Sequence, residues 1–417
     1  MAILAIVSFT VPESYAQSDG TWSIKSSHPL VIINPQQQKQ FNMWIFPDEP
    51  VGIIRWSDQY YFFGPGFNQK DGKIMQQGTY KFKGSLEHIT PAQTGWLDHM
   101  PTSCLKPGEQ EPSPDGSKFD RDYAGASFAY LVHAQGYDYP LWVLLYHGEF
   151  HQPFSDGNEH KAKFLTYSAG GLAVSYDQGE NFQKLGELFS PHVSLEEFES
   201  KIPQPDGVLD GGTASWVEAD KDGHHVDGQQ KDTYYYAIVG DKNTWEDNGY
   251  GFAIARAKKQ DVLDAIAQKK APVFMKYYVP SGGPQKGVDY FTQPAKGGQS
   301  TLLLNRADEH GYIAHPQLVY DDFIKKFILS YNYKQAKVYV RVSSDLTHWS
   351  DRTLIAEAPE GRKLFYPTLA GDGEDPKVVG RHFYLYFTTL PDTGNPGKDR
   401  WKKQFMRRDV DIALDNR

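Results

Sequence analysis

The sequence predicts an all-β fold, a five-bladed β-propeller of four-stranded antiparallel blades with one short inserted helix. Three observations lead to this prediction. Aromatic residues are abundant, with 26 Tyr, 24 Phe and 9 Trp, and such side chains suit half-buried strands. The 38 Gly and 26 Pro separate many short apolar runs by turns. A plan of about four strands recurs along the chain, and a repeat of roughly 40 to 50 residues is typical of propellers.

The repeats can be placed along the chain by their apolar runs and turns. The first two repeats are expected at residues 51–63, 73–82 and 86–89, and then at 124–132, 141–146 and 164–175. The third is expected at 210–218, 233–239 and 251–257, followed by a helix at 260–268 with apolar residues at helical spacing. The last two are expected at 311–320, 327–331 and 338–342, and at 366–368, 376–379, 382–388 and 405–412. Residues 19–40 are polar and Gln-rich, which predicts an extended arm.

The beginning of the chain predicts an export signal. An apolar run precedes Ser14-Tyr15-Ala16, a small-x-small cleavage pattern. We therefore expect a signal peptide at 1–17 and a single propeller domain at 18–417. The apolar run is too short to span a bilayer, and no other stretch is long and apolar enough. The mature protein is expected to be exported, either periplasmic or secreted, with no membrane span.

Charge and cysteine content narrow the choice of partners. The formal net charge of -9 disfavours non-specific binding to nucleic acid or to an anionic membrane surface, so neutral partners fit better. Cys104 is the single cysteine, which excludes an internal disulfide, and a small buried apolar side chain is its expected role. The sequence carries no signal of oligomeric state.

Polar residues gather at the ends of the hairpin in the second repeat. Because an antiparallel hairpin returns the chain to its starting edge, Asp122 should lie beside His147, Glu149 and His151. In a propeller, the first strand of each blade starts on the same face, so the residues at these starts should meet in one funnel. Asp48 and Glu49 stand at the start of the first repeat and are further candidates for this rim.

The blade plan resembles a known family. The segments that carry the resemblance are 344–349 (SDLTHW), 374–379 (EDPKVV) and 382–388 (HFYLYFT). They are similar to segments of the five-bladed propeller glycosidases, the group that contains arabinanases, β-xylosidases and fructan-acting enzymes. Residues 175–182 (SYDQGENF) are similar to the Asp-box turn of sialidase-type propellers, which is structural in those families. The resemblance implies a base Asp at the first blade entrance, a second Asp and a Glu acid, and here the first entrance offers Asp48 or Glu49.

Glycosidic cleavage needs one protonated and one ionised carboxyl group. Glu149 follows a buried run, where partial burial would favour an acid, and an ion pair at a strand end is the alternative. The base or nucleophile is expected to be Asp122 or Asp210. A strand-end cap is the alternative for Asp122, and a common Asp-Gly turn is the alternative for Asp210.

Other rim residues are expected to bind the substrate. The predicted substrate-binding residues are His147, His151, His315, Asp241, Glu374, Asp375, Trp216 and Tyr123. His147 and His151 could bind a metal together with Glu149, but a sugar-binding rim explains the same residues, so neither a metal nor a cofactor is expected.

A structural calcium is the alternative for the loop from Asp220 to Asp227, where a solvated turn is expected. The basic cluster at 398–408 is expected to be a solvated edge.

These observations predict an exported glycoside hydrolase that acts on a polysaccharide or oligosaccharide through paired carboxylates. Two alternatives stay open. A polysaccharide lyase on the same scaffold would need Arg or Lys beside a uronate carboxylate, whereas the predicted rim is mostly acidic. A non-catalytic propeller that binds carbohydrate would have carboxylates too far apart or too buried to flank one bond.

Overall fold

The computed structural model describes residues 13–16, 22–70, 73–91, 114, 116–152, 165–200, 207–209, 212, 214–226, 232–243 and 249–414. These residues form five sheets, one for each predicted blade. Blade one consists of β4 (Met43–Trp44), β5 (Gly52–Trp56), β6 (Gln59–Lys70), β7 (Lys73–Gly84) and β8 (Ile89–Pro91). Blade two consists of β9 (Tyr123–Val132), β10 (Leu141–Gln152), β11 (Leu165–Ser175), β12 (Gln183–Phe189) and β13 (Gly207–Leu209).

The other three blades follow the same plan with some additional short strands. Blade three consists of β14 (Ala214–Ala219), β15 (Tyr234–Lys242), β16 (Tyr250–Lys258), β17 (Met275–Tyr277), β18 (Phe291–Pro294) and β19 (Leu304–Asn305). Blade four consists of β20 (Ile313–Asp321), β21 (Lys326–Tyr333), β22 (Lys337–Ser343), β23 (Thr353–Glu357) and β25 (Val378–Val379). Blade five consists of β24 (Arg362–Ala370), β26 (His382–Pro391), β27 (Gln404–Leu414), β1 (Glu13–Ala16), β2 (Trp22–Ser26) and β3 (Leu30–Ile33).

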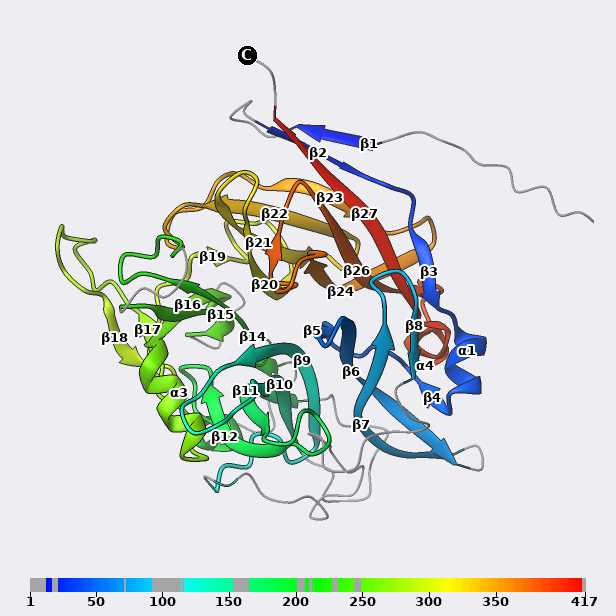
Figure 1. Cartoon of the computed structure of the whole chain (residues 1–417), viewed down its shortest axis with the longest axis horizontal. Coiled ribbons are helices and arrows are strands. Elements are labelled where there is room, and N and C mark those ends of the chain that lie inside the picture. Colours follow the sequence, from blue (N-terminus) through cyan, green and yellow to red (C-terminus); the bar gives the residue numbers. More distant parts are fainter. Residues whose placement is uncertain are drawn as a thin grey trace, which may run out of the picture.

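The blades are arranged radially, with β5, β9, β14, β20 and β24 around the centre (Figure 1). Each hydrophobic cluster joins two neighbouring blades, and together the clusters close the ring from blade one to blade five and back. Alternating apolar side chains on both faces of each sheet therefore hold the blades together. This arrangement confirms the predicted five-bladed propeller.

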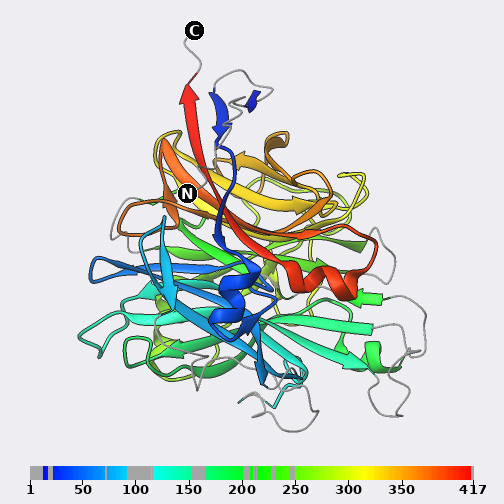
Figure 2. The same ribbon diagram turned by 90° about the vertical axis from the view of Figure 1, so that its right-hand side faces the viewer.

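The N-terminal part of the chain completes the last blade, which the sequence did not predict. The expected extended arm at 19–40 contains β2, which pairs with β27, and β3, which also pairs with β27. Trp22 and Ile24 are buried because they point from β2 into the cluster between blades four and five. Together β2 and β27 extend beyond the body of the propeller (Figure 2). The two ends of the described chain thus share one sheet.

The predicted helix is present as α3 (Lys259–Ala267), which buries Val262, Leu263 and Ile266. Further short helices in the described ranges are α1 (Pro35–Gln40), α2 (Leu195–Ser200), α4 (Pro396–Asp399) and the 3₁₀ helix η2 (Arg400–Lys402). The helix α1 begins with a capping box between Asn34 and Gln37, with Pro35 in its first turn. No helix in the described ranges is long and apolar enough to cross a membrane.

Replacing Asp321 by Asn is expected to stabilise the protein at alkaline pH. Burial raises the pKa of Asp321 to about 6, although its Oδ1 accepts hydrogen bonds from the backbone N–H groups of Phe323 and Ile324. Because this folded-state pKa lies above the unfolded value, the stabilising contribution of Asp321 is complete at low pH and is lost as pH rises through 6. Asn keeps an acceptor in the same position, so the free energy of unfolding should rise by about 1–3 kcal/mol at pH 8.

This prediction can be checked by chemical denaturation of both proteins at pH 4 and pH 8. The gain from Asp321→Asn should be present at pH 8 and nearly absent at pH 4. Asp322→Asn is the matched control, because Asp322 is the exposed neighbour of the buried Asp321. An equal gain at both pH values would show that burial of the charge is not the cause.

Candidate active site

Three of the innermost strands are interrupted near their start, at the same end of the propeller. In blade one, the segment between β4 and β5 contains Ile45 and the cis peptide bond Phe46-Pro47. In β20 the register with β21 shifts between Ala314 and Gln317, and in β24 the register with β26 shifts between Phe365 and Thr368. Ile45, His315 and Tyr366 lie at these interruptions with positive φ of 54°, 55° and 58°. A left-handed backbone is unusual for such bulky residues and often marks a functional site.

Asp48 is held by residues from blades two and five. Its carboxylate forms an ion pair with the ammonium group of Lys403, which is 5% exposed. The hydroxyl of Tyr366 lies 3.5 Å from Oδ1 of Asp48, and the hydroxyl of Tyr123 donates to the backbone carbonyl of Asp48 at 3.1 Å. The first blade entrance is therefore tied to blades two and five.

Glu149 and His147 form a second polar group at the end of β10. Because residues two apart in a strand share a face, both side chains point the same way, and Nε2 of His147 lies 3.0 Å from Oε1 of Glu149. The side chain of His147 is 5% exposed and that of Glu149 is 24% exposed. The ring of Tyr123 packs edge to face on His147, with ring centroids 5.7 Å apart. Glu149 is thus the more accessible member of a positioned pair.

The phenols of Tyr123 and Tyr366 connect these two groups. Burial raises the pKa of Tyr123 well above its usual value, and the negative charges of Asp48, Glu49 and Glu149 raise it further. The pKa of Tyr366 is raised by burial and by the same three carboxylates. Both phenols therefore stay protonated at neutral pH and can donate hydrogen bonds. Carboxylates from blades one and two are therefore close enough to both phenols to influence their pKa.

His315 supplies a neutral imidazole from blade four. Burial lowers the pKa of His315 to about 3, and the positive charges of His147 and Lys403 lower it further. Its ring packs against Tyr366 with centroids 4.5 Å apart. An uncharged imidazole at this position can accept or donate a hydrogen bond without adding charge to the site.

Blade three contributes the backbone of Gly212, just before β14. A Cβ atom placed on Gly212 would lie 2.0 Å from Nδ1 of His147. The absence of a side chain here lets the imidazole of His147 pack directly against the third blade. All five blades therefore contribute to one site, which we define by Asp48, Glu49, Tyr123, His147, Glu149, Gly212, His315, Tyr366 and Lys403 and call the channel site.

The predicted hairpin geometry at Asp122 is partly present. The backbone N–H of Asp122 donates to the carbonyl of Glu149 at 3.0 Å, so the two residues are neighbours at one sheet edge. The side chain of Asp122, however, forms a bidentate ion pair with Arg121, whose guanidinium group lies over the ring of Phe150. Asp210 and the side chain of His151 lie outside the described residues, so their roles stay predictions.

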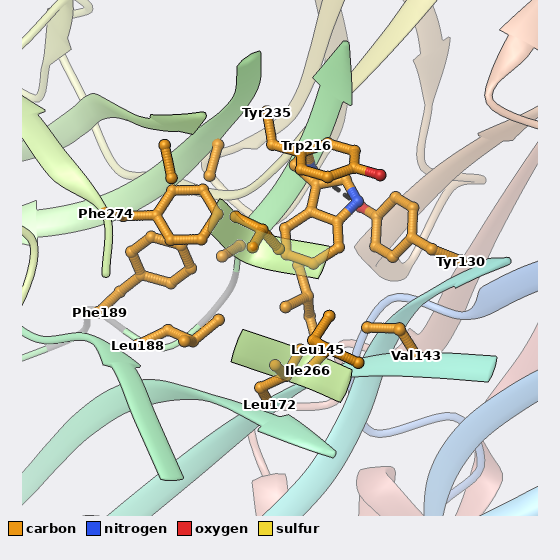
Figure 3. Packing of buried hydrophobic residues seen from close by; sticks show 14 of the residues in the cluster. Tyr130, Val143, Leu145, Leu172, Leu188, Phe189, Trp216, Tyr235, Ile266 and Phe274 are labelled. Atoms are coloured by element: carbon orange, nitrogen blue, oxygen red, sulfur yellow. Dashed lines mark hydrogen bonds between the residues drawn. The ribbon is translucent and has the colours of Figure 1, made fainter. Parts of the chain in front are cut away.

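Asp241 and Trp216 are deeply buried. Asp241 lies 2.9 Å from the ammonium nitrogen of Lys276, and both side chains are 0% exposed. Trp216 is buried among Tyr130, Tyr235 and Phe274, between blades two and three (Figure 3). Trp216 thus packs between two blades and the carboxylate of Asp241 pairs with Lys276, so their role in substrate binding stays a prediction.

Glu374 and Asp375 do not lie at the predicted rim. The first strand of blade five is β24, which ends at Ala370, and both residues follow it at the opposite end of the propeller. The prediction took 376–379 as a strand of blade five, whereas β25 pairs in parallel with β20 of blade four. The local pattern identified a strand correctly, but it contained no information about the sheet to which the strand belongs.

Lys403 is a residue of the channel site that was not predicted from the sequence, as is Gly212. The basic cluster at 398–408 was expected to be solvated, but Lys403, Arg407 and Arg408 are buried. The difference arises because β27, which Lys403 directly precedes and which contains Arg407 and Arg408, lies between β2 and β26 in the sheet of blade five. Among the residues that the structure describes, no group of three or more His, Cys, Asp or Glu side chains suits a metal ion. In the calcium-like loop, Asp220 accepts hydrogen bonds from the backbone of Asp222 and His224.

Comparison with known proteins gives matches to solved structures. No protein-family model and no curated protein matches the chain. The α-L-arabinanase of Cellvibrio cellulosa is 11% identical, with a TM-score of 0.41, and the match covers 86% of this chain and 90% of the arabinanase. The catalytic domain of a GH62 α-L-arabinofuranosidase from Coprinopsis cinerea is 10% identical, with a TM-score of 0.48 and coverage of 94% and 98%. An exo-1,5-α-L-arabinanase from a bovine ruminal metagenomic library is 11% identical, with a TM-score of 0.45 and coverage of 88% and 96%.

The matched structures include arabinanases, one of the groups that the sequence was found to resemble. With identities near 11% and TM-scores below 0.5, the assignment of the fold rests on the sheets of this chain and not on the matches. Those sheets, joined by hydrophobic clusters around one axis, make the chain a five-bladed β-propeller.

Proposed function

We propose that the protein is a glycoside hydrolase that cleaves glycosidic bonds of a neutral polysaccharide or oligosaccharide. One observation carries the proposal. Tyr123 connects carboxylates of two blades: its hydroxyl donates to the backbone carbonyl of Asp48 at 3.1 Å, and its ring packs on His147, whose Nε2 lies 3.0 Å from Oε1 of Glu149. Hydrolysis of a glycosidic bond needs two carboxyl groups that flank the bond, and carboxylates on separate blades meet that need.

Glu149 is the proposed acid. Its Oε1 lies 3.0 Å from Nε2 of His147, so the imidazole orients the carboxyl group that donates a proton to the leaving oxygen as the C–O bond breaks. Asp48 is the proposed base, because its carboxylate is paired with Lys403. It would take a proton from the water whose oxygen bonds to the anomeric carbon. In a retaining reaction the same carboxylate would first form an ester with that carbon.

The charges of the channel site favour a neutral substrate. Asp48, Glu49 and Glu149 carry carboxyl groups, and the ammonium group of Lys403 is already paired with Asp48. A uronate would bring a further negative charge next to these groups, which costs free energy. The uncharged side chains of Tyr123, Tyr366 and His315 can instead hydrogen-bond to sugar hydroxyls. The lyase alternative, which needs free cations at the site, is therefore less well supported.

A panel of polysaccharides, assayed for new reducing ends, tests this proposal. We expect release of reducing ends from at least one neutral polysaccharide. A product with the ultraviolet absorbance of an unsaturated uronate would support the lyase alternative instead. Binding to a polysaccharide without release of reducing ends would support the non-catalytic alternative.

Replacing Gly212 by Ala is expected to lower kcat by about 10²-fold, because the new methyl group would displace the imidazole of His147 and with it the carboxyl group of Glu149. Initial rates on the cleaved polysaccharide measure this effect. Gly373→Ala is the matched control, since a Cβ at Gly373 meets no atom within 4 Å. Full activity of Gly212→Ala would show that the position of His147 does not matter for the reaction.

We also propose that the protein is exported, to the periplasm or the medium. The support is the pattern Ser14-Tyr15-Ala16 after an apolar run. In the fold, β1 ends at Ala16 and is the outermost strand on its side of blade five, so cleavage after Ala16 would remove one edge strand and leave β2 paired with β27. Mass spectrometry of the mature protein, together with cell fractionation, tests this proposal. An intact N-terminus in the cytoplasmic fraction would contradict it.

A further inference from the structure

A cavity lies at the opposite end of the propeller from the channel site. It has a volume of about 260 Å³. Its lining comes from the final residues of the innermost strands, with Tyr130 in β9, Glu218 in β14 and Tyr320 in β20, and from Asp375 and Lys377 in the loop after β24. We call it the exit-face cavity, because it lies where the innermost strands end.

The exit-face cavity is separate from the channel site. Tyr123, in the channel site, and Tyr130, in the cavity, are seven residues apart in β9, which corresponds to about 20 Å along a strand. A small cavity of about 10 Å³ adjoins Tyr130 and is lined by residues that include Gln317, Leu318 and Leu369. That is close to the volume that one water molecule needs. A ligand in the cavity would therefore not touch the carboxylates of the channel site.

Aromatic rings form one wall of the cavity. Trp216 packs between Tyr130 and Tyr235, with ring centroids 4.8 Å and 5.0 Å away (Figure 3). The backbone N–H of Trp216 donates to the hydroxyl of Tyr130, which fixes the two side chains relative to each other. On the other side, His225 stacks on Tyr320 with centroids 3.4 Å apart and an angle of 7° between the planes. The rings are thus held rigidly before any ligand arrives, which lowers the entropic cost of binding.

Polar groups of both signs complete the lining. Asp375 forms an ion pair of 3.0 Å with Lys377, and Glu218 forms an ion pair of 2.7 Å with Lys259. Burial raises the pKa of the Tyr235 hydroxyl, and the carboxylates of Glu218 and Asp375 raise it further. The indole Nε1 of Trp216 is buried and has no hydrogen-bond partner among the residues that the structure describes. The lining therefore offers both hydrogen-bond donors and acceptors.

We propose that the exit-face cavity binds one neutral, polyhydroxylated ring, the size of a single sugar residue. Each sugar hydroxyl is both donor and acceptor, which matches paired carboxylates and ammonium groups, while the apolar C–H groups of the ring suit the apolar part of the lining, which includes Val226 and Val378. A volume just below the range of about 300–1,000 Å³ for drug-sized ligands fits a small ring. This inference does not rest on the proposed hydrolysis, since the cavity could bind a sugar in a protein that cleaves none.

Charged ligands fit the cavity less well. An organic cation would meet the ammonium group of Lys377, which lines the cavity and lies 4.4 Å from the centroid of Tyr130. An anion would meet the carboxylates of Glu218 and Asp375. A neutral ligand avoids both conflicts and can exchange hydrogen bonds with the existing ion pairs.

Isothermal titration tests this proposal with three probes: methyl β-D-xylopyranoside, methyl α-L-arabinofuranoside and methyl β-D-galactopyranoside. Choline serves as a cationic probe and acetate as an anionic one.

Val378 lines the cavity and is 37% exposed, so Val378→Trp can fill the space from its open side. Val273→Trp is the matched control, because Val273 is 74% exposed and does not line the cavity.

We expect at least one glycoside to bind the wild-type protein. Its affinity should fall at least tenfold in Val378→Trp and stay within twofold in Val273→Trp. Asp375→Ala, which removes an exposed carboxylate without filling the cavity, is a second variant and should also weaken binding if Val378→Trp does not fold. Binding that survives in both variants, no binding of any glycoside, or binding of choline or acetate alone would overturn the proposal. Reducing-end assays on the same variants should give wild-type rates, so a failure here is distinguishable from a failure of the proposed hydrolysis.

Discussion

Replacing Glu149 by Gln is expected to lower kcat on the cleaved polysaccharide by about 10²–10⁴-fold. Gln has the same shape as Glu and can still hydrogen-bond to Nε2 of His147, but it has no acidic proton to give to the leaving oxygen. The variant should therefore fold and bind the substrate as the wild type does. Initial rates of reducing-end formation and the binding affinity for the same polysaccharide measure the two effects separately.

Glu374→Gln is the matched control for this experiment. The sequence predicted that Glu374 lies at the same rim as Glu149. In the structure, Glu374 lies on the exposed loop after β24, at the opposite end of the propeller. The Glu374→Gln variant should therefore keep kcat within about twofold of the wild type. If Glu374→Gln lost activity and Glu149→Gln kept it, the channel site would not be the catalytic site.

Local patterns were sufficient to predict the blades. The runs 51–63, 124–132 and 141–146 each contain apolar residues bounded by turns, and they correspond to β5 and β6, to β9 and to β10. The hairpin rule also predicted correctly that the backbone of Asp122 lies beside that of Glu149. Such features depend on neighbours in the sequence, and for that reason they could be derived from it.

The direction of individual side chains could not be predicted in the same way. Asp122 and Glu149 are neighbours through their backbones, yet the carboxylate of Asp122 pairs with Arg121 while that of Glu149 pairs with His147. In a strand, one residue further along reverses the face to which a side chain points. The register alone therefore identified the edge of the sheet, but not which carboxylates share the channel.

Contacts between residues far apart in the chain could not be predicted from the sequence either. Lys403 pairs with Asp48, although 355 positions separate them. The contact exists because blade five, which contains β27, closes the ring next to blade one. The positive φ of His315 and Tyr366, in contrast, had a partial signal, since each residue precedes a proline in a run that otherwise reads as a strand. A proline inside an inner strand thus indicates an interruption that can present a side chain to the channel.

Replacing Asp48 by Asn is expected to lower kcat by about 10²–10⁴-fold, because the amide cannot accept the proton of the attacking water. Comparison with Asp122→Asn distinguishes a loss of catalysis from a loss of stability. Asp122 is 5% exposed and paired with Arg121, so its replacement should act mainly on stability, lowering the free energy of unfolding by about 1–3 kcal/mol. Initial rates and thermal unfolding of both variants measure these effects.

The double variant Asp48→Asn with Lys403→Met separates catalysis from charge balance. Asp48→Asn alone leaves the buried ammonium group of Lys403 without its carboxylate partner, which should destabilise the fold. Removing Lys403 as well should restore part of the stability, because no unpaired charge is left, but it should not restore kcat. Recovery of activity in the double variant would mean that Asp48 serves to neutralise Lys403. A larger loss of kcat in Asp122→Asn than in Asp48→Asn would instead assign the base to Asp122, as the hairpin in the sequence first indicated.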